Sequence, residues 1–143
     1  MSDSGPVVVV GVDGSTSSKE ALAWAADQAA RTQGRLEVVM CWRHPVNPGF
    51  AVDYSDVDFE KEAGRHLDAV LSEVLGETPV APVEKRVVEG HAAPTLVDAA
   101  RTADLLVVGS RGHGAFAEML VGSTSLYCVN HAACPVVVVR PRT

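Results

Sequence analysis

Cysteine is scarce in this chain, and its three residues form neither a disulfide nor a metal pattern. Cys41, Cys128 and Cys134 are odd in number and contain no Cys-x-x-Cys spacing, which excludes a disulfide-stapled scaffold. The five histidines show no His-x3-His spacing either, so the sequence predicts no zinc site. We interpret the cysteines as small core or loop residues of a protein in a reducing compartment.

Aromatic residues are few, and long apolar runs and an excess of basic charge are absent. The longest apolar run is far shorter than the ~18 residues of a membrane span, and residues 1–6 lack the basic segment of a signal peptide. These features predict a cytoplasmic protein with no membrane partner. The formal net charge of −6 argues against a nucleic-acid partner. A small anionic ligand stays possible, because backbone amides can hold one.

Hydrophobic residues are plentiful at 47% of the 143 residues, yet only 5% are aromatic, so valine, leucine and alanine must build the core. No linker, repeat or low-complexity tract divides the chain, which predicts one domain over residues 1–143. Five β-branched runs predict strands, and three of them lack polar alternation, as in parallel strands buried on both faces. The runs cover residues 7–12, 36–42, 83–88, 105–108 and 136–139.

Helix signals lie between these runs. Ser17 and Glu20 have the spacing of a capping box, and Gly34 is placed to end that helix. An apolar stripe over residues 63–74 predicts a second helix that Gly76 stops. Pro94 suits the first turn of a third helix, and a fourth is expected over residues 123–132.

Strands and helices therefore alternate, which predicts an α/β fold with an open, mainly parallel, Rossmann-like sheet and four helices on its two faces. The first and fourth strands are the most apolar, so we place them at the centre and predict strand order 3-2-1-4-5. Ligands of such sheets bind beyond the carboxyl ends of the strands, where the strand order reverses. Residues 11–15 and 109–112, both rich in glycine and small polar residues, end the two central strands.

The second of these ends carries the pattern Gly-x2-Gly-x9-Gly-Ser-Thr, which starts at Gly109 and continues through Gly112 to Gly122, Ser123 and Thr124. Glycines allow backbone amides to approach an anion closely. Amides, hydroxyls and the helix dipole at the start of the fourth helix favour phosphate. The alternative is that these glycines serve turns and that Ser123 only caps the helix. The pattern contains no Walker A motif, no Gly-x-Gly-x-x-Gly fingerprint and no hydrolase triad.

These segments resemble one known family over essentially the whole chain. Residues 11–15 (GVDGS), 107–112 (VVGSRG), Gly122-Ser123 and residues 134–139 (CPVVVV) occur in the order typical of the universal stress proteins. The resemblance extends to the branch of that family that binds ATP and carries Gly-x2-Gly-x9-Gly-Ser/Thr. It implies an ATP-binding stress or regulatory protein with slow or no hydrolysis, and a divalent ion, Mg²⁺ or Mn²⁺, accompanying the nucleotide.

The resemblance also implies a set of binding residues. Asp13 would accept hydrogen bonds from the ribose or lie beside the base, although a carboxylate there also suits helix capping. Cys41 would contact adenine, although a buried cysteine most often only packs. The walls and phosphate cradle would consist of Gly11, Val12, Gly109, Ser110, Arg111, Gly112, His113, Gly122, Ser123 and Thr124.

Three other functions stay open at this point: a slow ATPase or phosphotransferase, a module that binds cyclic AMP, and an interaction module without a nucleotide. No catalytic lysine or general base is evident, and the sequence therefore predicts no catalytic residue. The strand over residues 135–140 would form an apolar sheet edge, which natural proteins cover or use for pairing. Because members of the resembled family pair this strand, a homodimer is expected.

Overall fold

The computed structural model describes residues 5–45, 54–110 and 121–141. Within them a parallel sheet has the order β3-β2-β1-β4-β5, which confirms the predicted topology. The elements are β1 (Val7–Gly11), α1 (Thr16–Arg31), β2 (Arg35–Trp42), α2 (Phe59–Leu75), β3 (Val83–Glu89), α3 (Ala92–Ala99), the short 3-10 helix η2 (Ala100–Thr102), β4 (Leu105–Gly109), α4 (Ser123–His131) and β5 (Val136–Val139).

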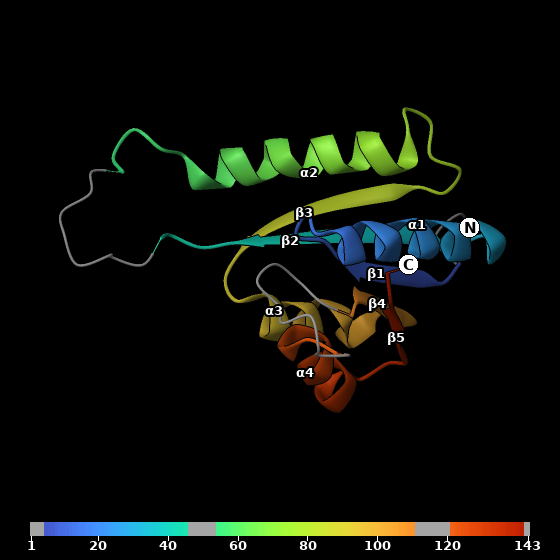
Figure 1. Cartoon of the computed structure of the whole chain (residues 1–143). Helices are drawn as coiled ribbons and strands as arrows, with labels where there is room; N and C mark the ends of the chain where they lie inside the picture. Colours follow the sequence, from blue (N-terminus) through green and yellow to red (C-terminus); the bar gives the residue numbers. More distant parts are fainter. Residues whose placement is uncertain (1–4, 46–53, 111–120, 142–143) are drawn as a thin grey trace.

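The helices cover the two faces of the sheet in pairs. α3 and α4 lie together on one side, and α2 lies on the other (Figure 1). Successive side chains of a strand point to opposite faces, and both faces are buried along the central strand: Val8 and Val10 join the core under α1 and α2, whereas Val9 joins the core under α3 and α4. This double burial explains why the central strands lack polar alternation.

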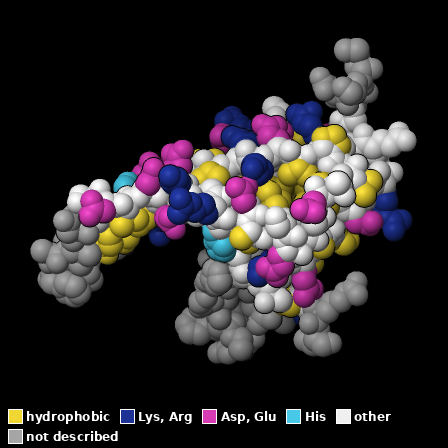
Figure 2. All heavy atoms as spheres, turned by 90° about the horizontal axis from the view of Figure 1, so that it is seen from above, with side chains coloured by type: hydrophobic (Ala, Val, Ile, Leu, Met, Phe, Trp, Pro, Cys, Tyr) yellow, Lys and Arg dark blue, Asp and Glu magenta, His cyan; other side chains and the backbone are white. Residues whose placement is uncertain are grey.

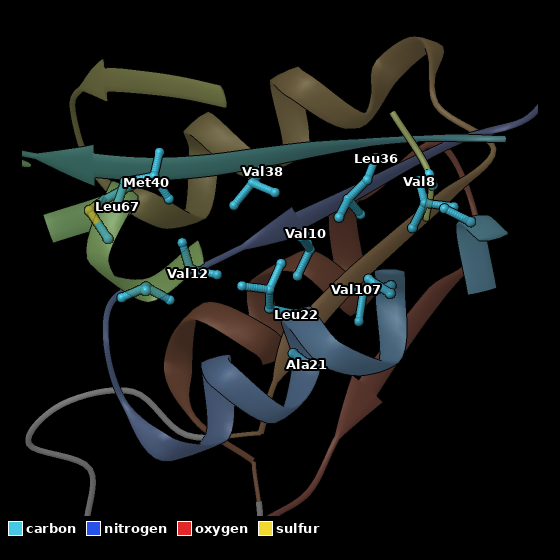
Figure 3. Close-up of a cluster of buried hydrophobic side chains, with 14 residues drawn as sticks. Val8, Val10, Val12, Ala21, Leu22, Leu36, Val38, Met40, Leu67 and Val107 are labelled. Atoms are coloured by element: carbon cyan, nitrogen blue, oxygen red, sulfur yellow. The ribbon is translucent and has the colours of Figure 1, made fainter. Parts of the chain in front are cut away.

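The larger core lies between the sheet and the α1–α2 layer. In Figure 3, Leu22 of α1 points toward Val10 of β1, and Leu67 of α2 lies beside Met40 of β2. The predicted stripe of α2 is confirmed, because Leu67 and Val70 are buried and the other stripe residues pack against the core. Alanine, valine, leucine and methionine side chains fill this space, and the described cluster contains no aromatic residue.

The start of α1 differs from the predicted capping box. Ser15 is the N-cap residue, and its Oγ accepts a hydrogen bond from the Ser18 amide at 3.2 Å. Ser17 already lies inside the helix, is buried, and donates its hydroxyl to the Val139 carbonyl at 3.3 Å. The prediction was wrong because Ser17 serves a contact between α1 and β5, which sequence spacing does not reveal.

Helix ends are partly as predicted. Gly76 ends α2 with a φ of 75°, and Pro94 lies in the first turn of α3. The predicted stop at Gly34 is displaced, since α1 ends at Arg31 and the left-handed residue is Gln33, with a φ of 57°. Gly34 is needed for a different reason: a Cβ there would collide with the Pro6 carbonyl.

The packing around Gly109 generates a stability prediction. A Cβ at Gly109 would lie 2.5 Å from Ser17 Oγ and 2.7 Å from the Ser17 carbonyl carbon. We expect Gly109→Ala to lower the free energy of unfolding by about 1–3 kcal/mol, measured by urea denaturation. The matched control is Gly64→Ala in α2, where a Cβ meets nothing within 4 Å. That helical substitution should raise stability by about 0.5–1 kcal/mol; equal effects of the two changes would contradict this packing argument.

Candidate ligand site at the carboxyl edge of the sheet

The segment after β1 folds into a tight turn ahead of α1. Gly11 ends the strand, where a Cβ would meet the Leu96 side chain at 2.6 Å, and Val12 is buried. Asp13 is exposed, and its Oδ1 accepts a hydrogen bond from the Ser15 amide at 2.9 Å. The carboxylate thus supports the turn that leads to the N-cap of α1, and it stands at the carboxyl end of the central strand.

The segment after β4 is tied to the start of α4 through one carbonyl group. The Ser110 carbonyl accepts hydrogen bonds from the Gly122 amide and, at 3.2 Å, from the Ser125 hydroxyl. The Ser110 amide donates to the Val139 carbonyl at 2.8 Å. Ser110 and Ser125 are both buried. These contacts place the N-terminus of α4 beside the carboxyl ends of β4 and β5.

Two of the predicted glycines have packing roles. The missing Cβ of Gly109 faces α1, and that of Gly11 faces Leu96 of α3. Gly122 is the N-cap residue of α4, with no side-chain capping bond. Ser123 is therefore the first helical residue and not the cap. The predicted residues Arg111, Gly112 and His113 lie outside the described residues.

A pocket of about 540 Å³ opens at this edge, between the end of β2, the start of α3 and the start of α4. Of the predicted residues that the structure describes, it brings together Cys41, Ser123 and Thr124. Gly11, Val12, Asp13, Gly109, Ser110 and Gly122 are not part of its described lining. The remaining lining residues, absent from the prediction, are Trp42, Arg43, Gly90, His91, Ala92, Ala93, Pro94 and Tyr127.

The missed wall comes mainly from the β3–α3 connection together with the first turn of α3. Gly90 adopts a φ of 149° and donates its amide to the Trp42 carbonyl at 2.9 Å. A residue with a side chain rarely takes this conformation. The sequence signal was present, since Gly90 and His91 follow the third strand, but β3 is an edge strand away from the predicted switch point.

Cys41 forms part of the pocket wall as a neutral thiol. Burial raises its pKa, and a hydrogen bond with the Thr95 side chain opposes that shift only in part. Thiols react as thiolates, so this environment disfavours nucleophilic chemistry. Cys41 therefore serves packing or ligand contact.

Charge in the pocket differs from charge over the rest of the chain. On the face seen in Figure 2, acidic and basic side chains are interspersed. The described pocket lining contains Arg43 and no carboxylate, although the whole chain carries a net charge of −6. The positive charge of Arg43 without a carboxylate beside it in the lining, together with the N-terminus of α4, favours an anionic ligand. In residues 5–45, 54–110 and 121–141, no group of three or more His, Cys, Asp or Glu side chains could hold a metal ion.

The fold and this pocket define an α/β domain of the class that binds ligands beyond the carboxyl ends of parallel strands. The model of the universal stress protein family (Usp) matches residues 6–140. The chain belongs to the universal stress protein family. Among the described helices, none has the length and apolar character required to cross a membrane.

Relatives and solved structures agree with this assignment. A universal stress protein of Mycolicibacterium smegmatis is 35% identical over 144 residues, covering 93% of this chain and 47% of the relative. The chain thus spans about half the length of the curated relatives it matches. The structure of a universal stress protein in complex with cAMP is similar, with a TM-score of 0.66, 27% identity, and coverage of 96% of this chain and 98% of that one. An AMP-bound family protein from Arabidopsis thaliana, with a TM-score of 0.64, 21% identity and coverage of 96% and 93%, shares the fold.

The buried thiol next to the site predicts a pH dependence. Burial raises the pKa of Cys128 to about 11, above the ordinary value of an unfolded thiol near 8.5. The folded state therefore holds its proton more tightly, and this contribution is complete below pH ~8.5. It is lost as the pH rises toward 11, which lowers the free energy of unfolding by up to about 3 kcal/mol.

Urea denaturation between pH 8 and 10.5 should show this loss in the wild-type chain. The Cys128→Ala variant should show a smaller loss over the same range, because it has no thiol to titrate. Parallel pH profiles for the two proteins would contradict a buried neutral thiol at position 128.

Proposed function

We propose that this protein binds ATP in the pocket between β2, α3 and α4, and uses it as a regulatory ligand with slow or no hydrolysis. The observation that carries the proposal is the composition of the pocket. The N-terminus of α4 forms part of its wall, and its described lining contains an arginine and no carboxylate. Helix N-termini bind phosphate through unpaired amides and the helix dipole. The pattern from Gly109 to Thr124, which resembles that of ATP-binding members, supports the same ligand.

Each end of the nucleotide has a proposed partner. The phosphates would lie at the start of α4, near Ser123 and Thr124. A Mg²⁺ or Mn²⁺ ion would be bound to them as part of the nucleotide complex. Adenine would lie against Cys41 at the end of β2, and Asp13 would face the ribose. The Trp42 indole N–H is buried and has no acceptor within the described part of the chain. A ligand that brings an acceptor would satisfy this donor.

Binding without rapid turnover fits the chemistry of the pocket. The described lining contains neither a lysine nor a carboxylate that could activate water or hold a transferring phosphoryl group. A slow ATPase or phosphotransferase is the enzymatic alternative, and a single-turnover assay with labelled ATP separates the two. The relative solved with cAMP makes cyclic AMP the second candidate ligand of the same pocket.

Ser123 offers a sharp test of phosphate binding, because it is exposed at the first position of α4. An acidic residue there should leave helix stability equal or higher, since a negative charge interacts favourably with the N-terminal dipole. The same charge should repel phosphate. We expect Ser123→Asp to lower ATP affinity at least tenfold in calorimetry, by roughly 1.4 kcal/mol or more.

The control is Ser123→Asn, which has nearly the same shape and no charge and should stay within about threefold of the wild type. Undiminished ATP binding by Ser123→Asp would refute a phosphate site at α4. Cyclic AMP titrated against the same three proteins then shows which nucleotide the wild-type pocket prefers.

We also propose that the protein forms a two-fold homodimer through β5. β5 is an edge strand that pairs only with β4 in the described sheet. The carbonyls of Pro135 and Val139 accept bonds from β4 and its extension, so alternate residues of β5 face β4. The backbone groups of Val136 and Val138 consequently point to the open edge and are available for pairing.

This backbone geometry selects the test. Val138→Pro removes an amide that faces the open edge, whereas Val137→Pro removes one that faces β4. We expect the wild-type chain to have a light-scattering mass of twice its 15.0 kDa, and Val138→Pro to be a folded monomer. Val137→Pro should instead lower thermal stability. A wild-type mass near 15 kDa at micromolar concentration would exclude the dimer.

A further inference from the structure

Arg43 differs from most described arginines in lacking an acidic partner. Arg31, Arg35, Arg65, Arg86 and Arg101 each lie within 3.7 Å of a carboxylate. Among the described residues, no carboxylate lies within ion-pair distance of Arg43. Arg140 shares this property but does not line the pocket. The guanidinium group at the pocket therefore forms no ion pair with any described side chain.

A histidine holds the Arg43 side chain. The Arg43 Nη1 atom lies 2.9 Å from Nδ1 and 3.1 Å from Nε2 of His91. Because Nη1 is almost equally far from both ring nitrogens, it lies over the face of the imidazole ring and not along the lone pair of either nitrogen. His91 precedes α3 as its N-cap residue but makes no side-chain capping bond. Its exposed ring contacts the exposed Arg43 side chain instead, and both residues line the pocket.

The pocket thus has two features that attract anions on different walls. One wall, from the ends of β2 and β3, presents Arg43 and His91; another, from α4, presents Ser123 and Thr124 at the helix N-terminus. A guanidinium group recognises phosphate by charge-assisted hydrogen bonds, and its planar fork can engage two oxygens. An anion in the pocket would be attracted from both walls.

We infer that Arg43, oriented by His91, binds the phosphate nearest the ribose and so makes the pocket selective for phosphorylated nucleotides over the free nucleoside. This inference rests on the proposed nucleotide site. Arg43 is a ligand-contacting residue in this scheme, and His91 is a positioning residue. Because AMP, ADP and ATP share that phosphate, the contribution of Arg43 to binding is similar for all three.

The first experiment compares ligands on the wild type and Arg43→Gln. We expect Arg43→Gln to lower the affinities for AMP, ADP and ATP by a similar factor of about ten in calorimetry. Adenosine, measured by ligand-observed NMR, should bind the two proteins within twofold. The wild type should also lose more ATP affinity than the variant between 50 and 500 mM NaCl. Arg101→Gln, which removes the same charge from η2, beyond the C-terminal end of α3, is the matched control and should bind like the wild type.

The second experiment tests the role of His91. His91→Phe keeps a planar ring on which the guanidinium can lie and should retain most of the affinity for AMP. His91→Leu removes the planar ring and should weaken AMP binding severalfold without changing adenosine binding. Circular dichroism checks that each variant is folded.

Several outcomes would overturn the inference. They are an equal loss of adenosine and AMP binding in Arg43→Gln, no loss at all, or the same loss in Arg101→Gln. If the wild type binds ATP and Arg43→Gln binds it equally well, only the role of Arg43 fails. If the wild type binds no adenine nucleotide, the proposed function fails together with it.

Discussion

The geometry of the candidate site depends on hydrogen bonds between the Ser110 carbonyl and the start of α4. This carbonyl accepts from the Gly122 amide, and the buried Ser125 hydroxyl lies within hydrogen-bond distance of it, at 3.2 Å, and of the Gly122 carbonyl, at 3.0 Å. Buried polar groups are costly when unpaired, so this arrangement has few alternatives. The carbonyl holds the N-terminus of α4 against the end of a central strand, which is where an anion-binding helix end can meet the sheet edge.

This anchor is effective because the central strands are themselves immobilised by packing. β1 and β4 lie side by side with valine and leucine buried on both faces. Because the interior is close-packed, the ends of these strands can shift little. Ser17 of α1 adds a bond to the Val139 carbonyl, so α1, β4, α4 and β5 meet at one corner. The described lining of the pocket combines residues of β2, α3 and α4 with Arg43, Gly90 and His91 from the connections.

The small residues of this chain have two separable structural roles. Gly109 and Gly11 allow α1 and α3 to pack closely against the sheet, and this requirement exists whether or not a ligand binds. Gly122 is the N-cap residue of α4, and its amide donates to the Ser110 carbonyl. The glycines of one sequence motif can therefore serve packing against other elements or the start of a helix, and the direction of each missing Cβ distinguishes these roles. The same distinction applies to Ser17 and Ser123, which are alike in type and different in role.

The sequence by itself determined the fold class, the strand order and the edge of the sheet that carries the site. Those follow from local properties: continuous β-branched runs, helical periodicity, and turn residues after the strands. Ser123 and Thr124 could be predicted as site residues for the same reason, because they stand at the start of a helix, whereas Cys41 was predicted only through the resemblance to the family. The pairing of Arg43 with His91 and the contact between Ser17 and β5 were decided by tertiary structure. They join residues up to 122 positions apart, and no local pattern records which of two distant polar groups will meet once the helices pack.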